Sequence, residues 1–362
     1  MSPDNPQVVA VRGTPAPSIV VREQPTLFGR LGKWMFAALV LMVVALVHGY
    51  NQYHSYFNPA NGPQEKYHSL SKEAMKKIAI ITVDGAILNG EDSFVKKQID
   101  RVRDDKDVVA VVLRIVSPGG SVTASDYLYH HLRKLVEDRK AADGRELPMV
   151  VSMGGVCASG GYYLAMAVGG TENAIFAEPT TWTGSIGVVI PHYDFSGSIA
   201  ALRIKDDSLT SGPHKLMGSF TRSMGEEDRK LLQTLVDHSF TEFKAIVTSG
   251  RPKFKDDPEA LDAVATGQIF TAKQALANGL VDRIGFVEEA IARAAELAQV
   301  SPDNVRCIKY DRPPGLLGEL FGVSAAAPAS DGIDLADMLN LTTPRAYYLW
   351  SSLPALLSNS AE

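Results

Sequence analysis

Apolar residues along the chain form one long uninterrupted run near the N-terminus and many short runs after it. The long run, Trp34 to Tyr50, contains no Asp, Glu, Lys or Arg. It is long enough to cross a bilayer if Leu31 to Gly32 and Tyr50 to Tyr53 lie at the two interfaces. The pattern therefore predicts one transmembrane anchor over residues 31–53.

Two other interpretations of this run stay open at the level of sequence. A cleaved signal peptide has a similar apolar core, although the leader before this one is long and no clear A-x-A site follows it. A buried core helix would show a polar face, which Trp34 to Val47 lacks.

The residues before the apolar run predict its orientation in the membrane. Four basic residues precede it, namely Arg12, Arg22, Arg30 and Lys33. The positive-inside rule therefore predicts that the N-terminus is cytoplasmic and that the chain after the run lies outside the membrane.

The shorter apolar runs alternate between strand-like and helix-like spacing. Strands are expected at Lys77 to Val83, Val108 to Val116, Met149 to Met153, Ala174 to Ala177, Ser185 to Ile190 and Val305 to Lys309. Helices are expected over Phe94 to Val102, from Ser121 onward, and over Gly160 to Ala167, Glu226 to Thr248, Thr271 to Asn278 and Val287 to Leu297. This alternation predicts an α/β fold with a mainly parallel sheet.

The same patterns divide the chain into five parts. We expect a disordered cytoplasmic tail at 1–30, the anchor at 31–53, a polar linker at 54–76, one globular domain at 77–312 and a C-terminal extension at 313–362. The extension carries an apolar patch at Tyr347 to Leu357. The sequence leaves open whether this patch caps a subunit contact, touches the membrane or occupies a groove.

Composition narrows the classes of function. The chain has 36 Lys and Arg against 41 Asp and Glu, a net charge of −5, and no basic run. This argues against a nucleic-acid surface, because phosphate binding needs clustered positive charge. There are two cysteines and no CxxC, HExxH or P-loop pattern, so we expect no disulfide framework, metal or other cofactor.

The strongest candidate for chemistry is the stretch GGVCASGGYYLAMA, residues 154–167. It places Ser159 between a predicted buried strand and a predicted helix, among glycines that let backbone and substrate approach closely. Unpaired N–H groups at a helix N-terminus could bind a developing negative charge. The alternative is a tight turn in which Ser159 only caps the helix.

A serine hydroxyl needs a neighbouring base to become a nucleophile. Among the histidines, His192 and His214 are the least unsuitable, but neither lies in a stretch that is typical of a catalytic base. A lysine can serve if burial keeps it uncharged and no carboxylate pairs with it. Lys215 fits best, since no acidic residue lies between Asp207 and Glu226. The alternative is an ordinary solvated lysine.

Five blocks in order resemble the signal peptide peptidase A family, also called protease IV. They are LRIVSPGGSVTASD (Leu113 to Asp126), CASGGYYLA (Cys157 to Ala165), TGSIGVV (Thr183 to Val189), SGPHK (Ser211 to Lys215) and TGQIFTAKQALANGLVD (Thr266 to Asp282). Each block alone is weak evidence, but together, in this order over roughly residues 77–300, they are strong evidence.

The resemblance implies a ClpP/crotonase-like fold with a serine–lysine dyad. By motif position Ser159 would be the nucleophile and Lys215 the general base, and Ser185 would hold the lysine amine by a hydrogen bond. The oxyanion would be met by the backbone N–H groups of Gly120 and Gly160. The block SGPHK departs from the family pattern at Pro213 and His214, and Cys157 is expected to pack rather than react.

The resemblance also implies the short, single-domain form of the family, as a homo-oligomer with active sites near the subunit boundaries. It leaves open whether Lys215 meets the serine of its own chain or that of a neighbouring chain. The implied activity is a membrane-anchored serine endopeptidase on the extracytoplasmic side of the cytoplasmic (inner) membrane. Its substrates would be remnant signal peptides and other short or unfolded peptides. The alternatives are a crotonase-like acyl-CoA enzyme, which needs no nucleophile at Ser159, and a catalytically silent membrane scaffold.

Overall fold

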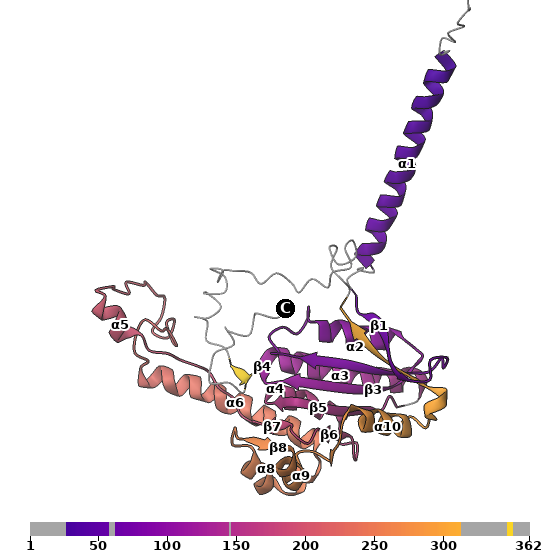
Figure 1. Ribbon diagram of the computed structural model, residues 1–362. Coiled ribbons are helices and arrows are strands. Elements are labelled where there is room, and N and C mark those ends of the chain that lie inside the picture. The colour runs from indigo at the N-terminus through magenta and orange to yellow at the C-terminus, as the bar shows by residue number, and fades with distance from the viewer. Residues whose placement is uncertain (1–26, 58–61, 145, 313–345, 350–362) are drawn as a thin grey trace, which may run out of the picture. The chain divides into compact units, whose positions relative to one another are not determined.

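The computed structural model of the chain describes residues 27–57, 62–144, 146–312 and 346–349 (Figure 1). It divides into two compact units, Met1–Ala60 and Asn61–Glu362. The predicted tail at 1–30 lies outside the described residues except for its last four. The same holds for the C-terminal extension at 313–362 except for residues 346–349.

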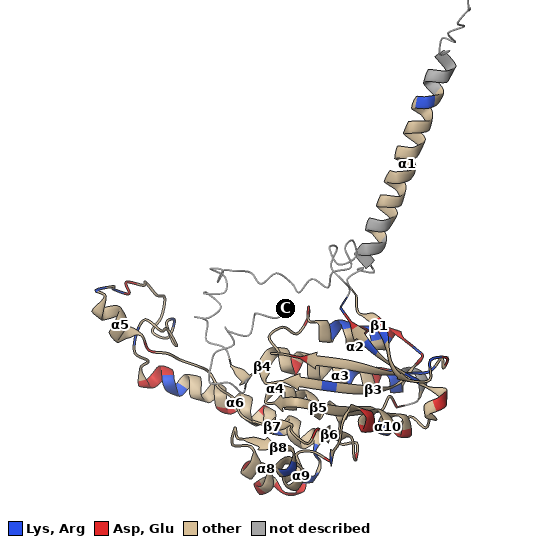
Figure 2. Cartoon of the chain, viewed as in Figure 1, with Lys and Arg blue, Asp and Glu red and all other residues tan. Residues whose placement is uncertain are grey.

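The described part of the first unit is helix α1 (Leu27–Phe57). Its stretch Gly32–Tyr50 is apolar, exposed throughout, and long enough to cross a membrane by length and composition. Lys33 is the one charged residue in that stretch, and the rest of it is tan in Figure 2. The predicted apolar helix is confirmed, and it begins before and ends after residues 31–53.

In the second unit a mainly parallel sheet runs in the order β1-β10-β2-β3-β5-β6-β9, with β7 and β8 attached at the end of β5. Within the described residues its strands are β1 (Gln64–Leu70), β2 (Lys77–Asp84), β3 (Val108–Ser117), β5 (Met149–Ala158), β6 (Ile175–Ala177), β7 (Trp182–Gly184), β8 (Ile269–Thr271), β9 (Arg283–Ile284) and β10 (Arg306–Asp311). The pairs β1–β10 and β7–β8 are antiparallel, and the other pairs are parallel. The predicted α/β class is confirmed.

Helices cover both faces of this sheet, because successive residues of its central strands point to opposite sides. On one face Ile81 and Leu113 pack with α2 (Phe94–Asp104) and α3 (Val122–Asp143). On the other face Ile80 packs against α10 (Val287–Leu297). The remaining helices are α4 (Gly160–Ala165), α5 (Ser196–Ala201), α6 (Glu226–Gly250), α7 (Lys253–Asp256), α8 (Pro258–Val264) and α9 (Ala272–Asn278), with short 3-10 turns η1 (Met166–Val168) and η2 (Pro302–Asn304).

Two sequence predictions differ from the structure. The strand expected at Ser185 to Ile190 is absent, and β7 ends at Gly184 instead. Gly184 and Ser185 have φ angles of +89° and +51°, which turn the chain out of the extended conformation. Residues 64–70, predicted as linker, form β1, whose polar sequence suits an edge strand with one open side.

A small second sheet lies beside the large one. It consists of β4 (Gly119–Ser121), directly after β3, and β11 (Tyr347–Leu349) from the C-terminal part of the chain. The two strands are antiparallel, and Figure 1 shows yellow β11 next to β4. A segment more than 200 positions away in sequence therefore lies on the strand that follows β3.

A half-buried charge cluster ties the sheet edge to the loop before β3. The Lys77 ammonium group donates to Glu65 on β1 at 2.7 Å and to Asp105 at 2.9 Å. Burial alone would raise the pKa of Asp105, but the hydrogen bonds from Lys77 and from the Asp107 N–H outweigh it and lower the pKa below the ordinary value. This carboxylate therefore favours the folded state in its charged form.

We expect Asp105→Asn to weaken the acid sensitivity of folding. Because the pKa of Asp105 is lower in the folded state, its carboxylate contributes fully to the free energy of unfolding above about pH 4. This contribution is lost as the pH falls through the folded-state pKa. The free energy of unfolding should therefore fall less steeply below about pH 4 in the variant than in the wild type, as measured by urea denaturation in detergent. Asp303→Asn, at an exposed position in η2, is the control, and identical pH slopes for wild type and Asp105→Asn would refute the assignment.

Candidate active site

Ser159 stands at the junction between β5 and α4, as the sequence predicts. It is 1% exposed, and its backbone has φ +52° and ψ −114°. A non-glycine residue in this region costs about 1–3 kcal/mol, which the surrounding structure must hold in place. Backbone hydrogen bonds do so: the Ser159 N–H donates to Gly184 O at 2.8 Å, and the Tyr163 N–H donates to Ser159 O at 2.9 Å.

Glycine backbone surrounds Ser159 on the side of β4. A β-carbon on Gly119 would lie 2.7 Å from the Gly160 nitrogen and 3.0 Å from the Ser159 β-carbon. A β-carbon on Gly160 would lie 3.1 Å from the Gly120 nitrogen. The segments Gly119–Gly120 and Ser159–Gly160 are therefore in direct backbone contact, and a side chain at Gly119 or Gly160 would separate them.

The Gly120 N–H points toward β11. On the opposite edge of β4 the Ile87 N–H donates to Gly119 O at 2.9 Å, and the Ser121 N–H donates to Ile87 O at 2.8 Å. Successive residues of a strand direct their N–H and C=O groups to opposite edges, so those of Gly120 face away from Ile87. Gly120 is the residue that pairs with Tyr348.

Ser185 follows the end of β7 as Ser159 follows the end of β5. The last residues of these parallel strands, Ala158 and Gly184, are paired, and the Ser159 N–H donates to Gly184 O, so the two serines lie close together. Both are buried and both have positive φ angles, +52° and +51°. The Ser185 N–H donates to Gln268 O at 2.7 Å, which fixes its position.

Lys215 belongs to a different region. Figure 1 shows α5 and the loop after it projecting from the sheet at the N-terminal end of α6. Lys215 lies in that loop and is exposed, and within the described ranges no carboxylate lies at ion-pair distance from its ammonium group. The structure of one chain thus brings Ser159, Ser185, Gly120 and Gly160 together, but not Lys215.

Of the two candidate histidines, His214 lies in the same loop as Lys215, and His192 lies before α5. His192 Nε2 is 3.2 Å from the backbone oxygen of Ser219. His214 Nδ1 is 2.7 Å from Asp228 Oδ1 in the first turn of α6. This contact ties His214, the residue before Lys215, to the long helix α6.

An aromatic cluster adjoins α4. Tyr348 of β11 is 1% exposed; its ring centroid lies 5.1 Å from that of Tyr163 and 4.5 Å from that of Phe243. The sequence did not assign Tyr163, Phe243 or Gly119 to the site, and it singled out Tyr348 only as part of the apolar patch at Tyr347 to Leu357. The three aromatic residues are distant from one another in sequence, so no local pattern connects them.

Two buried side chains near Ser159 and the distribution of metal-binding residues also bear on the chemistry of the site. Cys157 is fully buried, and burial raises the pKa of its thiol, which suits packing rather than nucleophilic attack. Ser125 is buried with no hydrogen-bond partner in the described part of the chain, and its Oγ lies 2.5 Å from where a Gly160 β-carbon would stand. Across the described residues, no group of three or more His, Cys, Asp or Glu could hold a metal ion.

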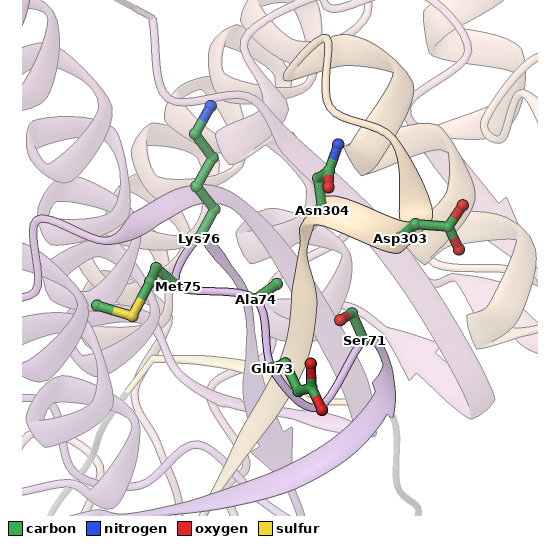
Figure 3. Close-up of a pocket in the computed structure, with 7 residues that line it drawn as sticks. All are labelled: Ser71, Glu73, Ala74, Met75, Lys76, Asp303 and Asn304. Carbon is green, nitrogen blue, oxygen red and sulfur yellow. The ribbon is translucent and has the colours of Figure 1, made fainter.

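An open pocket of about 550 Å³ lies elsewhere, between the loop after β1 and η2. It contains another serine and lysine, Ser71 and Lys76. Figure 3 shows the Lys76 side chain pointing away from the Ser71 hydroxyl, so the pocket offers no second serine–lysine pair.

Comparisons with known proteins point to one family. The model of Peptidase family S49 matches residues 141–301. Protease 4 of Salmonella typhi is 36% identical over 230 residues, covering 62% of this chain and 35% of that protein. A candidate protease of Synechocystis sp. is 36% identical over 267 residues, covering 74% of this chain and 89% of the relative. A candidate signal peptide peptidase SppA of Enterococcus faecium is 32% identical over 227 residues, covering 60% and 62%.

The chain spans about a third of the length of the Salmonella typhi relative. Among solved structures, a mutant of the 1510-N membrane-bound stomatin-specific protease in complex with a substrate peptide is 15% identical, with a TM-score of 0.40. The match covers 68% of this chain and 96% of that chain.

We expect Gly119→Ala to separate the two backbone segments beside Ser159. Its methyl group would clash with the Tyr348 oxygen of β11 and would meet the Gly160 nitrogen at 2.7 Å, and φ of +103° is strained for alanine. The chain should lose about 1–3 kcal/mol of unfolding free energy, measured by chemical denaturation. Gly155→Ala is the matched control, because a β-carbon there meets no atom within 4 Å. Equal stability of the two variants would contradict the close approach.

Proposed function

Since the chain belongs to peptidase family S49, we propose that it is a membrane-anchored serine endopeptidase with a Ser159–Lys215 dyad. The observation that carries the proposal is the buried, strained serine at the end of β5, in contact with bare glycine backbone. Strain of this kind persists where function requires a fixed side-chain direction.

In this mechanism the Ser159 hydroxyl attacks the substrate carbonyl while the Lys215 amine takes its proton. The Gly120 and Gly160 N–H groups stabilise the oxyanion, which is supported by the direction of the Gly120 N–H and by the contact between the two segments. Ser185, which follows β7 as Ser159 follows β5, orients the lysine amine. The amine then protonates the leaving group, and water hydrolyses the acyl-enzyme.

The base comes from a neighbouring copy of the chain in this proposal. Lys215 is exposed, has no carboxylate partner among the described residues, and lies on a segment that projects from its own sheet. An amine left free in this way can be buried against another subunit, where desolvation would lower its pKa. The active oligomer is therefore the unit in which Ser159 and Lys215 meet.

The proposed location and substrate are supported by α1 and by the family. The apolar stretch Gly32–Tyr50 anchors the chain in the cytoplasmic (inner) membrane, and the basic residues before it keep the N-terminus inside. The peptidase domain, proposed for residues 77–312 with β1 added at its edge, then acts outside on remnant signal peptides and other short or unfolded peptides. The candidate SppA of Enterococcus faecium supports this substrate class by its name.

We expect Ser159→Ala and Lys215→Ala each to abolish hydrolysis of a fluorogenic peptide by the full chain in detergent. Co-expression of the two variants should restore about a quarter of wild-type activity, because mixed oligomers pair an intact serine with an intact lysine at one interface in four.

The control is co-expression of Ser159→Ala with the Ser159→Ala/Lys215→Ala double variant, which has no intact nucleophile and should stay inactive. Turnover by either single variant would refute the dyad. Inactivity of the co-expressed pair would place both residues of the dyad in one chain.

A further inference from the structure

The turn that carries Lys215 is tied to α6 by the side chain of His214. His214 Nδ1 lies 2.7 Å from Asp228 Oδ1, and its Nε2 lies 3.9 Å from Glu227 Oε1. The backbone closes the same turn, since the Met217 N–H donates to His214 O at 3.0 Å. The residue directly before the proposed base is therefore fixed to a long helix by its side chain and to its own turn by its carbonyl group.

The first turn of α6 concentrates negative charge. It contains Glu226, Glu227 and Asp228, and Figure 2 shows red at this end of the helix. The helix dipole stabilises carboxylates at a helix N-terminus. The side chain of Asp228 is 13% exposed and that of Glu227 is 82% exposed. An ion pair with Asp228 is therefore less screened by water, and stronger, than one with Glu227.

Partners from the projecting segment already occupy Asp228. Oδ1 faces His214, and Oδ2 lies 3.6 Å from the Arg222 guanidinium group, so each carboxylate oxygen has a partner. Lys215 directly follows His214 and carries its ammonium group on a flexible four-carbon stem. It is the cation placed to pair with Asp228 if the imidazole is removed.

We propose that His214 is a positioning residue for Lys215: its contact with Asp228 holds the turn and keeps this carboxylate from pairing with the amine of the general base. The inference rests on the proposed role of Lys215. An amine accepts a proton only in its uncharged form, and a carboxylate partner favours the charged form. His214 acts through Lys215 and has no assigned contact with the substrate.

The test is the pH profile of kcat/KM for a fluorogenic peptide, measured on the full chain in detergent. In His214→Ala, Asp228 is free to pair with Lys215, and an opposite charge at this range favours protonation of an amine. The acid limb of the profile should therefore move up by about one pH unit. This corresponds to about tenfold lower kcat/KM on that limb, with recovery toward the wild-type value at high pH.

Two further variants separate this role from support of the loop. His214→Ala/Asp228→Asn lacks both the imidazole and the carboxylate, so its acid limb should return to the wild-type position. His214→Asn offers an amide donor in place of Nδ1 and should keep the wild-type profile, because the contact with Asp228 survives. His238→Ala, at an exposed position of α6, is the matched control and should also keep that profile.

Three results overturn the inference. One is an unchanged profile in His214→Ala. Another is an equal loss of kcat/KM at every pH in that variant, which would assign the histidine to loop structure alone. The third is a double variant whose acid limb stays where that of His214→Ala lies, since Asp228 would then not be the competitor.

Failure of the proposed function gives a different pattern. If Lys215→Ala retains turnover, the lysine is not the base, and the role of His214 is refuted with it. If Lys215→Ala is inactive while His214→Ala keeps the wild-type profile, the dyad stands and only the positioning role is refuted.

Discussion

The close approach of two backbone segments, Gly119–Gly120 after β3 and Ser159–Gly160 after β5, is the constraint on which the rest of the structure depends. These strands are parallel neighbours, so their carboxyl ends emerge at the same edge of the sheet. Glycine permits the contact, because a β-carbon at Gly119 would lie 2.7 Å from the Gly160 nitrogen, and one at Gly160 would lie 3.1 Å from the Gly120 nitrogen. The contact places Ser159 beside β4, and the hydrogen bonds of Ile87 to the other edge of β4 leave Gly120 facing β11.

The parts of the fold that follow from local pattern could be predicted from the sequence. Strands β2 and β3 are β-branched runs that end at glycine or proline signals, and α10 was predicted with its observed bounds because its apolar spacing is regular. Ser159 and its glycines were found for the same reason, since the strand, the small residues and the helix are contiguous. In these places the local propensity and the tertiary packing agree.

The parts that depend on distant partners could not be predicted. Strand β1 has a polar sequence and forms because β10 offers it an edge. The aromatic cluster of Tyr163, Phe243 and Tyr348 combines residues from α4, α6 and β11, which no periodicity in the sequence connects. The position of Lys215 relative to Ser159 depends on a long helix and a projecting loop. The motif SGPHK therefore singles out this lysine as a candidate but does not predict where it lies. The same limit applied to the patch at Tyr347 to Leu357: the sequence offered a groove as one of three places for it.

Strand β4 is held by Ile87 on one side and presents the backbone of Gly120 on the other. Hydrogen bonds of this kind require a chain whose own N–H and C=O groups are unsatisfied. A natively folded neighbour has already used those groups internally, whereas a loose fragment has not. In the proposed peptidase, this edge of β4, on which β11 lies, would select a chain by its conformational state and not by its sequence.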